Sequence, residues 1–213
     1  MFDHVTIRVS DRVTSARFYR TVLQAIEIGG ELEGETFTGW HDFSIAQASE
    51  ETPVTRNLHV GFVAPSRHHV DEFWRAGTEA GFESDGAPGP RPQYTDSYYG
   101  SFLLDPDGNS IEAVHHDDVR DGNVDHLWIG VSDPDAAAAF YRTIAPQAGL
   151  REGKGVAGPI FRGANATFSL IADGRPPTEN LHLALSTSSA EAAGDLLDPD
   201  GNSVELIHRG AAV

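Results

Sequence analysis

Alternating apolar and polar residues mark several short segments of the chain as strands. In residues 4–9, Val5, Ile7 and Val9 share one face, because successive side chains of a strand point to opposite sides. His4 falls on the other face together with polar neighbours. This pattern predicts a strand with one aliphatic face for packing and one mixed face.

Between such strands, apolar residues recur at the spacing of a helix. The pattern predicts helices at 13–26 and 66–80, each with one buried face. The apolar residues concerned are Phe18, Val22 and Ala25 in the first helix and Val70, Phe73 and Trp74 in the second. Strands are predicted at 3–10, near 30–40, at 42–48, at 57–64, near 94–104 and at 110–115. The first half of the chain is therefore predicted to be two βαβββ units in tandem.

The second half of the chain repeats the first. The string "DHVTIRVSD" at 3–11 aligns with "DHLWIGVSD" at 125–133, 122 residues later, and "NLHVGF" at 57–62 aligns with "NLHLAL" at 180–185. The turn "DPDGN" recurs after only 93 residues, so about thirty residues are missing from the second copy. Turn chemistry explains the string itself, but both copies continue into a strand that carries one glutamate among apolar residues.

These repeats predict two homologous domains, at 1–117 and 123–210. The second has one complete unit at 125–172, followed by strands at 180–186 and 203–208. The intervening segment is too short for a helix and two strands. The fold class is therefore α+β, with tandem βαβββ units, duplicated, and a shortened second copy.

Composition narrows the possible partners. The net charge of −17 argues against nucleic acid, whose phosphates the protein would repel. The chain has no Cys, which excludes thiolate ligands and a cysteine nucleophile, and no apolar run long enough to span a bilayer. Its first residues alternate like a strand and lack a signal-peptide core, so we expect a cytoplasmic protein. Lys154 is the only lysine, a usage typical of a GC-rich bacterial genome.

The mixed strand faces carry residues that can bind metal. Each copy places two histidines and one glutamate on three different strands, opposite the aliphatic faces. Two imidazoles and one carboxylate bind a divalent ion on one side and leave positions open for substrate. A capping histidine or a solvated glutamate would account for any one of them singly. The residues are His4, His59 and Glu112 in the first copy and His126, His182 and Glu205 in the second.

The strings "DHVTIRVSD…FYRTVL", "LHVGFVA" and "LLDPDGNSIEAV" resemble the vicinal oxygen chelate superfamily. Its members include glyoxalase I, extradiol dioxygenases, fosfomycin-resistance enzymes and bleomycin-binding proteins. The resemblance covers nearly all of the first copy and most of the second. It implies βαβββ units paired into partly open barrels around a metal.

The resemblance also implies a ligand set and a metal. The superfamily's ligand positions match the six residues above, grouped by copy, with the shortened copy expected to hold the more exposed and weaker site. Fe(II) is the first choice of metal, with Mn(II), Zn(II) or Ni(II) as alternatives. Gln47 is the nearest candidate for the fourth ligand of glyoxalase I, and Phe102 stands where dioxygenases carry a tyrosine. His41 and Tyr99 are candidates for the catalytic acid and base, with Tyr94 and Tyr98 nearby.

Two functions from different classes follow from the resemblance. The first is a metal-dependent enzyme that chelates adjacent oxygens of a small, possibly aromatic, substrate. The alternative is a metal-free protein that sequesters a drug in the same groove. Either function implies a small-molecule ligand, with no nucleic acid or membrane as partner, and leaves a homodimer open.

Overall fold

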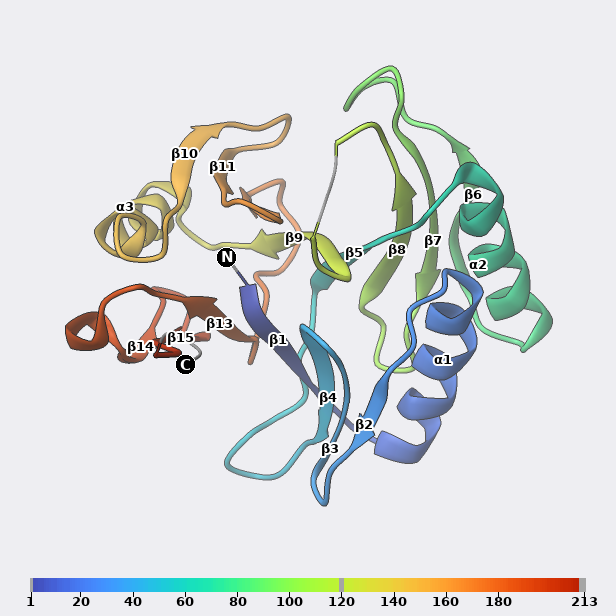
Figure 1. Cartoon of the computed structure of the whole chain (residues 1–213), viewed down its shortest axis with the longest axis horizontal. Helices are drawn as coiled ribbons and strands as arrows, with labels where there is room; N and C mark the ends of the chain where they lie inside the picture. The colour runs from blue at the N-terminus through green and yellow to red at the C-terminus, as the bar shows by residue number, and fades with distance from the viewer. Residues whose placement is uncertain (1, 119–120, 211–213) are drawn as a thin grey trace.

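Two large sheets and three α-helices make up the part of the chain that the structure describes, residues 2–118 and 121–210 of a computed structural model (Figure 1). No helix in this part is long and apolar enough to cross a membrane. The helices are Arg12–Ala25 (α1), Arg67–Glu79 (α2) and Pro134–Ile144 (α3).

The strands divide between a seven-stranded and an eight-stranded sheet. The order in the seven-stranded sheet is Gly194–Leu197 (β14), Ser203–Ile207 (β15), His182–Ser186 (β13), Phe2–Val9 (β1), Phe43–Gln47 (β4), Phe37–Trp40 (β3) and Glu31–Glu33 (β2). The order in the eight-stranded sheet is Arg151–Lys154 (β10), Pro159–Arg162 (β11), Thr167–Ile171 (β12), Val124–Gly130 (β9), Leu58–Val63 (β5), Ser110–His115 (β8), Tyr99–Leu104 (β7) and Ser84–Pro90 (β6).

The tandem βαβββ units predicted from the sequence are confirmed. Three complete units run β1–α1–β2–β3–β4, β5–α2–β6–β7–β8 and β9–α3–β10–β11–β12. Strand β6 was not predicted, because its sequence "SDGAPGP" has neither alternation nor β-branched residues. The shortened unit also retains more than expected: a short 3-10 turn at Ala190–Ala192 (η1) and strand β14 stand between β13 and β15.

Each sheet joins strands from both halves of the chain. β1 pairs antiparallel with β13 and parallel with β4, whereas β5 pairs antiparallel with β9 and parallel with β8. The first unit therefore shares a sheet with the fourth, and the second with the third (Figure 1). This exchange decides which residues of the two copies meet.

The aliphatic strand faces and the helices form the core. Val5, Ile7 and Val9 are fully buried, as their alternation predicts, and so are Phe18 and Val22 of α1. Burying each such side chain contributes about 1.5–3 kcal/mol. The opposite faces of the same strands are thereby turned away from the core.

Both copies of the repeated "VSD" string end in a helix cap. The Asp11 carboxylate accepts hydrogen bonds from the backbone N–H groups of Val13 and Thr14, and Asp133 does the same at the start of α3. An aspartate N-cap stabilises a helix by about 1 kcal/mol. Each cap fixes the point at which the chain leaves the first strand of its unit.

The repeated "DPDGN" turn ties three elements together. The buried Asp105 carboxylate accepts hydrogen bonds from backbone N–H groups of its own turn and, at 2.9 Å, from the Tyr19 hydroxyl of α1. The Asn109 side chain accepts from the Leu58 N–H at 3.1 Å and donates to the Thr55 carbonyl at 3.1 Å. The turn therefore anchors β8 against both α1 and the start of β5.

The second copy repeats this arrangement. The Tyr141 hydroxyl donates to Asp198 at 3.2 Å, and Asn202 bonds to Leu181 and Thr178 as Asn109 does to Leu58 and Thr55. The turn is therefore duplicated because each copy uses it to set a glutamate-bearing strand beside a histidine-bearing one.

We predict that Asn109→Ala lowers the free energy of unfolding by about 2–4 kcal/mol, because it leaves buried backbone groups unpaired. Urea unfolding followed by circular dichroism measures this. Asp107→Ala is the matched control in the same turn: this side chain is half-buried and accepts one exposed hydrogen bond, from the Ser10 N–H, so its loss should cost under about 1 kcal/mol. Equal losses in the two variants would contradict the anchoring role.

Candidate metal centres

The six predicted ligands converge in two groups, each drawn from both halves of the chain. In each group, one potential ligand atom per residue lies within 4.8 Å of the others. The grouping by copy predicted from the sequence is wrong, because β1 lies beside β13 while β5 lies beside β9. We call the first group, His59, Glu112 and His126, the inner site and the second, His4, His182 and Glu205, the outer site.

The inner site is buried. His59, Glu112 and His126 are 9%, 1% and 6% exposed, so the expectation that His126 would lie in the more exposed site is also wrong. The Nε2 atom of His59 lies 3.1 Å from Glu112 Oε2 and 3.2 Å from Nε2 of His126. Nε2 of His126 in turn lies 3.3 Å from Glu112 Oε2. Three polar atoms of almost fully buried side chains thus face one another.

A chain of hydrogen bonds fixes the tautomer of His59. The Ser110 hydroxyl donates to Asp85 at 2.6 Å, because a carboxylate only accepts. The same oxygen lies 3.1 Å from Nδ1 of His59 and therefore accepts from it. With its proton on Nδ1, a neutral His59 presents a lone pair at Nε2 to the centre of the site.

Asp125 holds His126 in the same way. Its carboxylate lies 2.8 Å from Nδ1 of His126, and its other oxygen lies 2.8 Å from Nε2 of His116. An Nδ1–H bond to a carboxylate is the usual support for a metal-binding imidazole, because it orients the ring and raises its basicity. His126 therefore also directs Nε2 toward the centre.

Glu112 is positioned by a phenol. The Tyr98 hydroxyl donates to Glu112 Oε1 at 3.0 Å and leaves Oε2 directed at the two histidines. Burial, the nearby Glu112 carboxylate and this bond hold the pKa of Tyr98 well above its usual range. Tyr98 is therefore a permanent donor at neutral pH.

The electrostatics of the inner site favour a cation at its centre. Burial opposes a charge on either imidazole and lowers the pKa of His59. For His126, the hydrogen-bonded carboxylates of Asp125 and Glu112 outweigh burial and raise the pKa to about 10. A proton and a divalent metal ion would compete for the same lone pair. Two imidazole nitrogens and a carboxylate oxygen with supporting hydrogen bonds fit such an ion.

Two glycines make room for the ligands. A Cβ atom on Gly61 would lie 2.3 Å from the His126 ring, and one on Gly100 would lie 2.3 Å from Glu112 Oε1. Any larger residue would push the ring or the carboxylate out of place. The backbone of β5 and β7 is therefore shaped around these two side chains.

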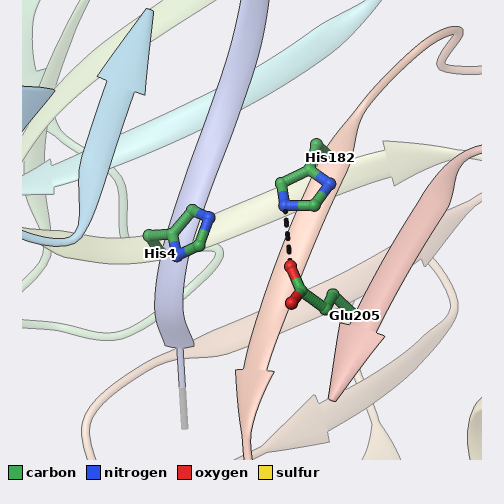
Figure 2. A group of neighbouring side chains, drawn as sticks. All are labelled: His4, His182 and Glu205. Atoms are coloured by element: carbon green, nitrogen blue, oxygen red, sulfur yellow. Dashed lines mark ion pairs between the residues drawn. The ribbon is translucent and has the colours of Figure 1, made fainter. Parts of the chain in front are cut away.

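The outer site consists of the same three residue types, His4, His182 and Glu205, in a more exposed setting (Figure 2). His4 on β1 bonds through Nδ1 to Asp3 at 3.0 Å, and His182 on β13 lies 3.1 Å from Ser203. His182 Nε2 lies 3.4 Å from Glu205 Oε2. The side chains of His4, His182 and Glu205 are 31%, 22% and 33% exposed, so water reaches all three.

The two sites differ at matched positions. Where β5 has Gly61 opposite His126, β13 has Ala184 opposite His4. Asp125 contacts His116 in the inner site, whereas Asp3 contacts Arg209, which holds the pKa of Asp3 at about 2. The segment that would match Tyr98 is missing from the shortened unit. The outer glutamate therefore lacks the phenol that positions Glu112.

Clefts lead to both sites. The inner site opens to a cleft of about 450 Å³ on the side of His126 and to one of about 230 Å³ on the side of His59. We call these the His126-side and His59-side clefts. The outer site opens to a cleft of about 610 Å³, which we call the outer cleft. The His126-side cleft and the outer cleft have volumes that suit small organic ligands.

The other predicted residues are dispersed. His41 lines the outer cleft, with its side chain 76% exposed. The Tyr99 hydroxyl donates to Asp71 at 2.9 Å, on α2, and contacts neither site. Gln47 bonds to the Arg12 N–H and to nearby backbone carbonyls and is not part of either site. Phe102 packs against the His59 ring with centroids 5.9 Å apart.

The sequence analysis missed the residues that support the candidate ligands, although two kinds of them, an aspartate and a serine, carry a signal in both copies. The aspartate before the first histidine and the serine after "DPDGN" occur in both copies, at Asp3, Asp125, Ser110 and Ser203. A repeat that keeps both the ligand and its neighbour points to a supporting partner. Tyr98 has no counterpart and could not be distinguished from its neighbouring tyrosines.

A sequence model of the glyoxalase/bleomycin resistance protein/dioxygenase superfamily matches residues 1–113. The chain therefore belongs to this superfamily, as its resemblance implied. No curated protein shows significant similarity to the chain.

Solved structures of several proteins are similar to this chain. The chain is 31% identical to a glyoxalase/bleomycin resistance protein from Albidiferax ferrireducens, over 55% of this chain and 99% of that one, with a TM-score of 0.50. Glyoxalase I from Zea mays matches over 97% of this chain and 92% of that one, at 17% identity and a TM-score of 0.67. A putative dioxygenase from Bacillus subtilis matches over 97% and 84%, at 13% identity and a TM-score of 0.64. The last two likenesses show the fold alone.

We predict that Gly61→Ala weakens metal binding at the inner site by about tenfold or more, or about 1.4 kcal/mol, because the added methyl displaces His126. Competition for Co(II) against a chromophoric chelator measures the affinity. Ala184→Gly, the reciprocal change at the outer site, is the matched control and should not weaken binding. Unchanged affinity in Gly61→Ala would show that the ring position is not critical.

Proposed function

We propose that this chain is a metal-dependent enzyme of the vicinal oxygen chelate type, with its reaction centre at the inner site. The observation that carries the proposal is the convergence of two imidazole nitrogens and one carboxylate oxygen, each held by its own hydrogen-bonding partner. A site that only packed or bound an apolar drug would have no need to orient three lone pairs inward. Fe(II) is the preferred metal, with Mn(II), Zn(II) or Ni(II) as alternatives.

A divalent ion held by His59, His126 and Glu112 would act as a Lewis acid on adjacent oxygens of a substrate. Three protein ligands on one side leave the His126-side cleft for a small molecule. Tyr94 and Trp128 line this cleft, with their rings 5.7 Å apart. Their faces suit a flat, aromatic substrate with vicinal oxygens.

Proton transfer at the inner site is proposed to involve the tyrosines that line the cleft. Burial raises the pKa of Tyr94, so its phenol is protonated at neutral pH and is available as a donor to a substrate oxygen. Tyr98 is occupied by Glu112 and acts by holding that carboxylate. We therefore propose Tyr94 in place of Tyr99 as the candidate acid at this site.

The outer site is proposed as a second, weaker metal site. Its residues are of the same types, but they are more exposed and lack the counterpart of Tyr98. His41 lines its cleft, so this residue is the candidate acid or base there. This ranking replaces the expectation that the shortened copy alone would form the weaker site.

One observation favours the alternative of metal-free sequestration. Tyr94, Tyr98 and Trp128 present aromatic rings to the His126-side cleft, as a drug-binding groove would. Under this alternative an aromatic drug would bind tightly without metal, and no metal would support turnover.

We predict that the wild-type protein, purified without a chelating tag, binds one metal ion tightly and a second more weakly. His59→Ala should weaken metal binding at the tight site by a factor of about 100 or more, because it deletes one of three ligands. His182→Ala, the matched change at the outer site, should remove only the weak site. Metal titration with elemental analysis measures both, and loss of the tight site in His182→Ala alone would reverse the ranking.

We predict oxygen uptake or a spectral change with a catechol after anaerobic loading with Fe(II), and at least a hundredfold loss of the rate in Glu112→Ala. Tyr99→Phe, whose hydroxyl faces α2, should leave the rate within about twofold. Oxygen electrode measurements over a panel of catechols give the rates. Tight binding of an aromatic drug by the metal-free protein, with no turnover under any metal, would establish sequestration instead.

A further inference from the structure

One aromatic side chain lines both clefts of the inner site. Trp128 lines both the His126-side and the His59-side cleft, and the remaining lining residues differ apart from Ile171. Its ring centroid lies 5.1 Å from that of His59 and 6.3 Å from that of His126. The indole therefore stands next to both histidines, between the two approaches.

The surroundings of Trp128 hold it in this position. It is the cross-strand partner of His59 on β5 and lies beside Ser169 on β12, within the middle of the eight-stranded sheet. The Tyr94 ring packs edge-on against it. An indole fixed on a central strand and packed against a second ring acts as a wall rather than a mobile lid.

The outer site provides an internal comparison. Thr6 occupies the position of Trp128 on β1, and Ser44 occupies that of Ser169 on β4. The two hydroxyls lie 2.7 Å apart, so the floor of the outer cleft is small and polar. This cleft is one space of about 610 Å³. The approach to the inner site is thus divided into two clefts where Trp128 stands. The outer cleft, with the small Thr6 at the matched position, is one space.

We propose that Trp128 determines the substrate specificity of the inner site by confining the substrate to the His126-side cleft. This inference rests on the proposed function, because it concerns molecules whose vicinal oxygens reach the inner ligands. The substrate class is a planar aromatic diol that stacks against the indole and extends toward β11 and β12, whose Ile160 and Ser169 line that cleft. A diol with a second ring directed toward His59 would collide with Trp128.

Trp128→Thr tests this by installing the residue of the outer site. Catechol and 3-phenylcatechol are the probes, because they share the diol and differ by one ring. Their affinities are measured by calorimetry on metal-free and Zn(II)-loaded protein, in a His182→Ala background that disables the outer site. Trp128→Phe is the control that keeps an aromatic wall, and circular dichroism confirms folding of each variant.

The expected result is that Trp128→Thr shifts the affinity ratio at least tenfold toward 3-phenylcatechol, while Trp128→Phe shifts it less than threefold. Equal shifts in the two variants, no shift in Trp128→Thr, or no binding of either probe would overturn the proposal. A shift that occurs in the metal-free protein when Zn(II) does not bind would support the role of Trp128 and contradict the proposed metal dependence.

Discussion

The structure depends on the antiparallel pairing of first strands between the two halves of the chain. β1 pairs with β13, and β5 pairs with β9, so each glutamate-bearing strand meets a histidine from the other half. Neither half contains a complete ligand set on neighbouring strands. The duplication is therefore a requirement of both sites, and loss of either half would leave each site with at most two of its three ligands.

Much of the fold and the identity of the candidate ligands could be predicted from local patterns. Alternation in the strands of the first copy placed His4, His59 and Glu112 opposite the aliphatic faces, and the repeat added the other three candidate ligands. Their grouping could not be predicted, because the pairing of β5 with β9 is a long-range contact with no signature in either strand. Strand β6 lacks alternation, and Tyr98 reaches Glu112 only through the path of its loop.

The two sites show how similar ligand sets acquire different properties. Gly61 lets His126 lie against β5, whereas Ala184 occupies the matched position opposite His4. Tyr98 fixes Glu112, and the missing segment of the fourth unit leaves Glu205 without such a partner. Trp128 divides one approach, and Thr6 leaves the other open. Burial and the neighbouring side chains that position the candidate ligands, rather than the ligand types, thus distinguish the inner site from the outer site.

The most direct test of the shared sites is a crystal structure of the Zn(II)-loaded protein with anomalous scattering recorded at the zinc edge. The account predicts the strongest anomalous peak between His59 Nε2, His126 Nε2 and Glu112, with any weaker peak at His4, His182 and Glu205. A peak that joins His4 to His59, or the absence of any peak at the six residues, would contradict it.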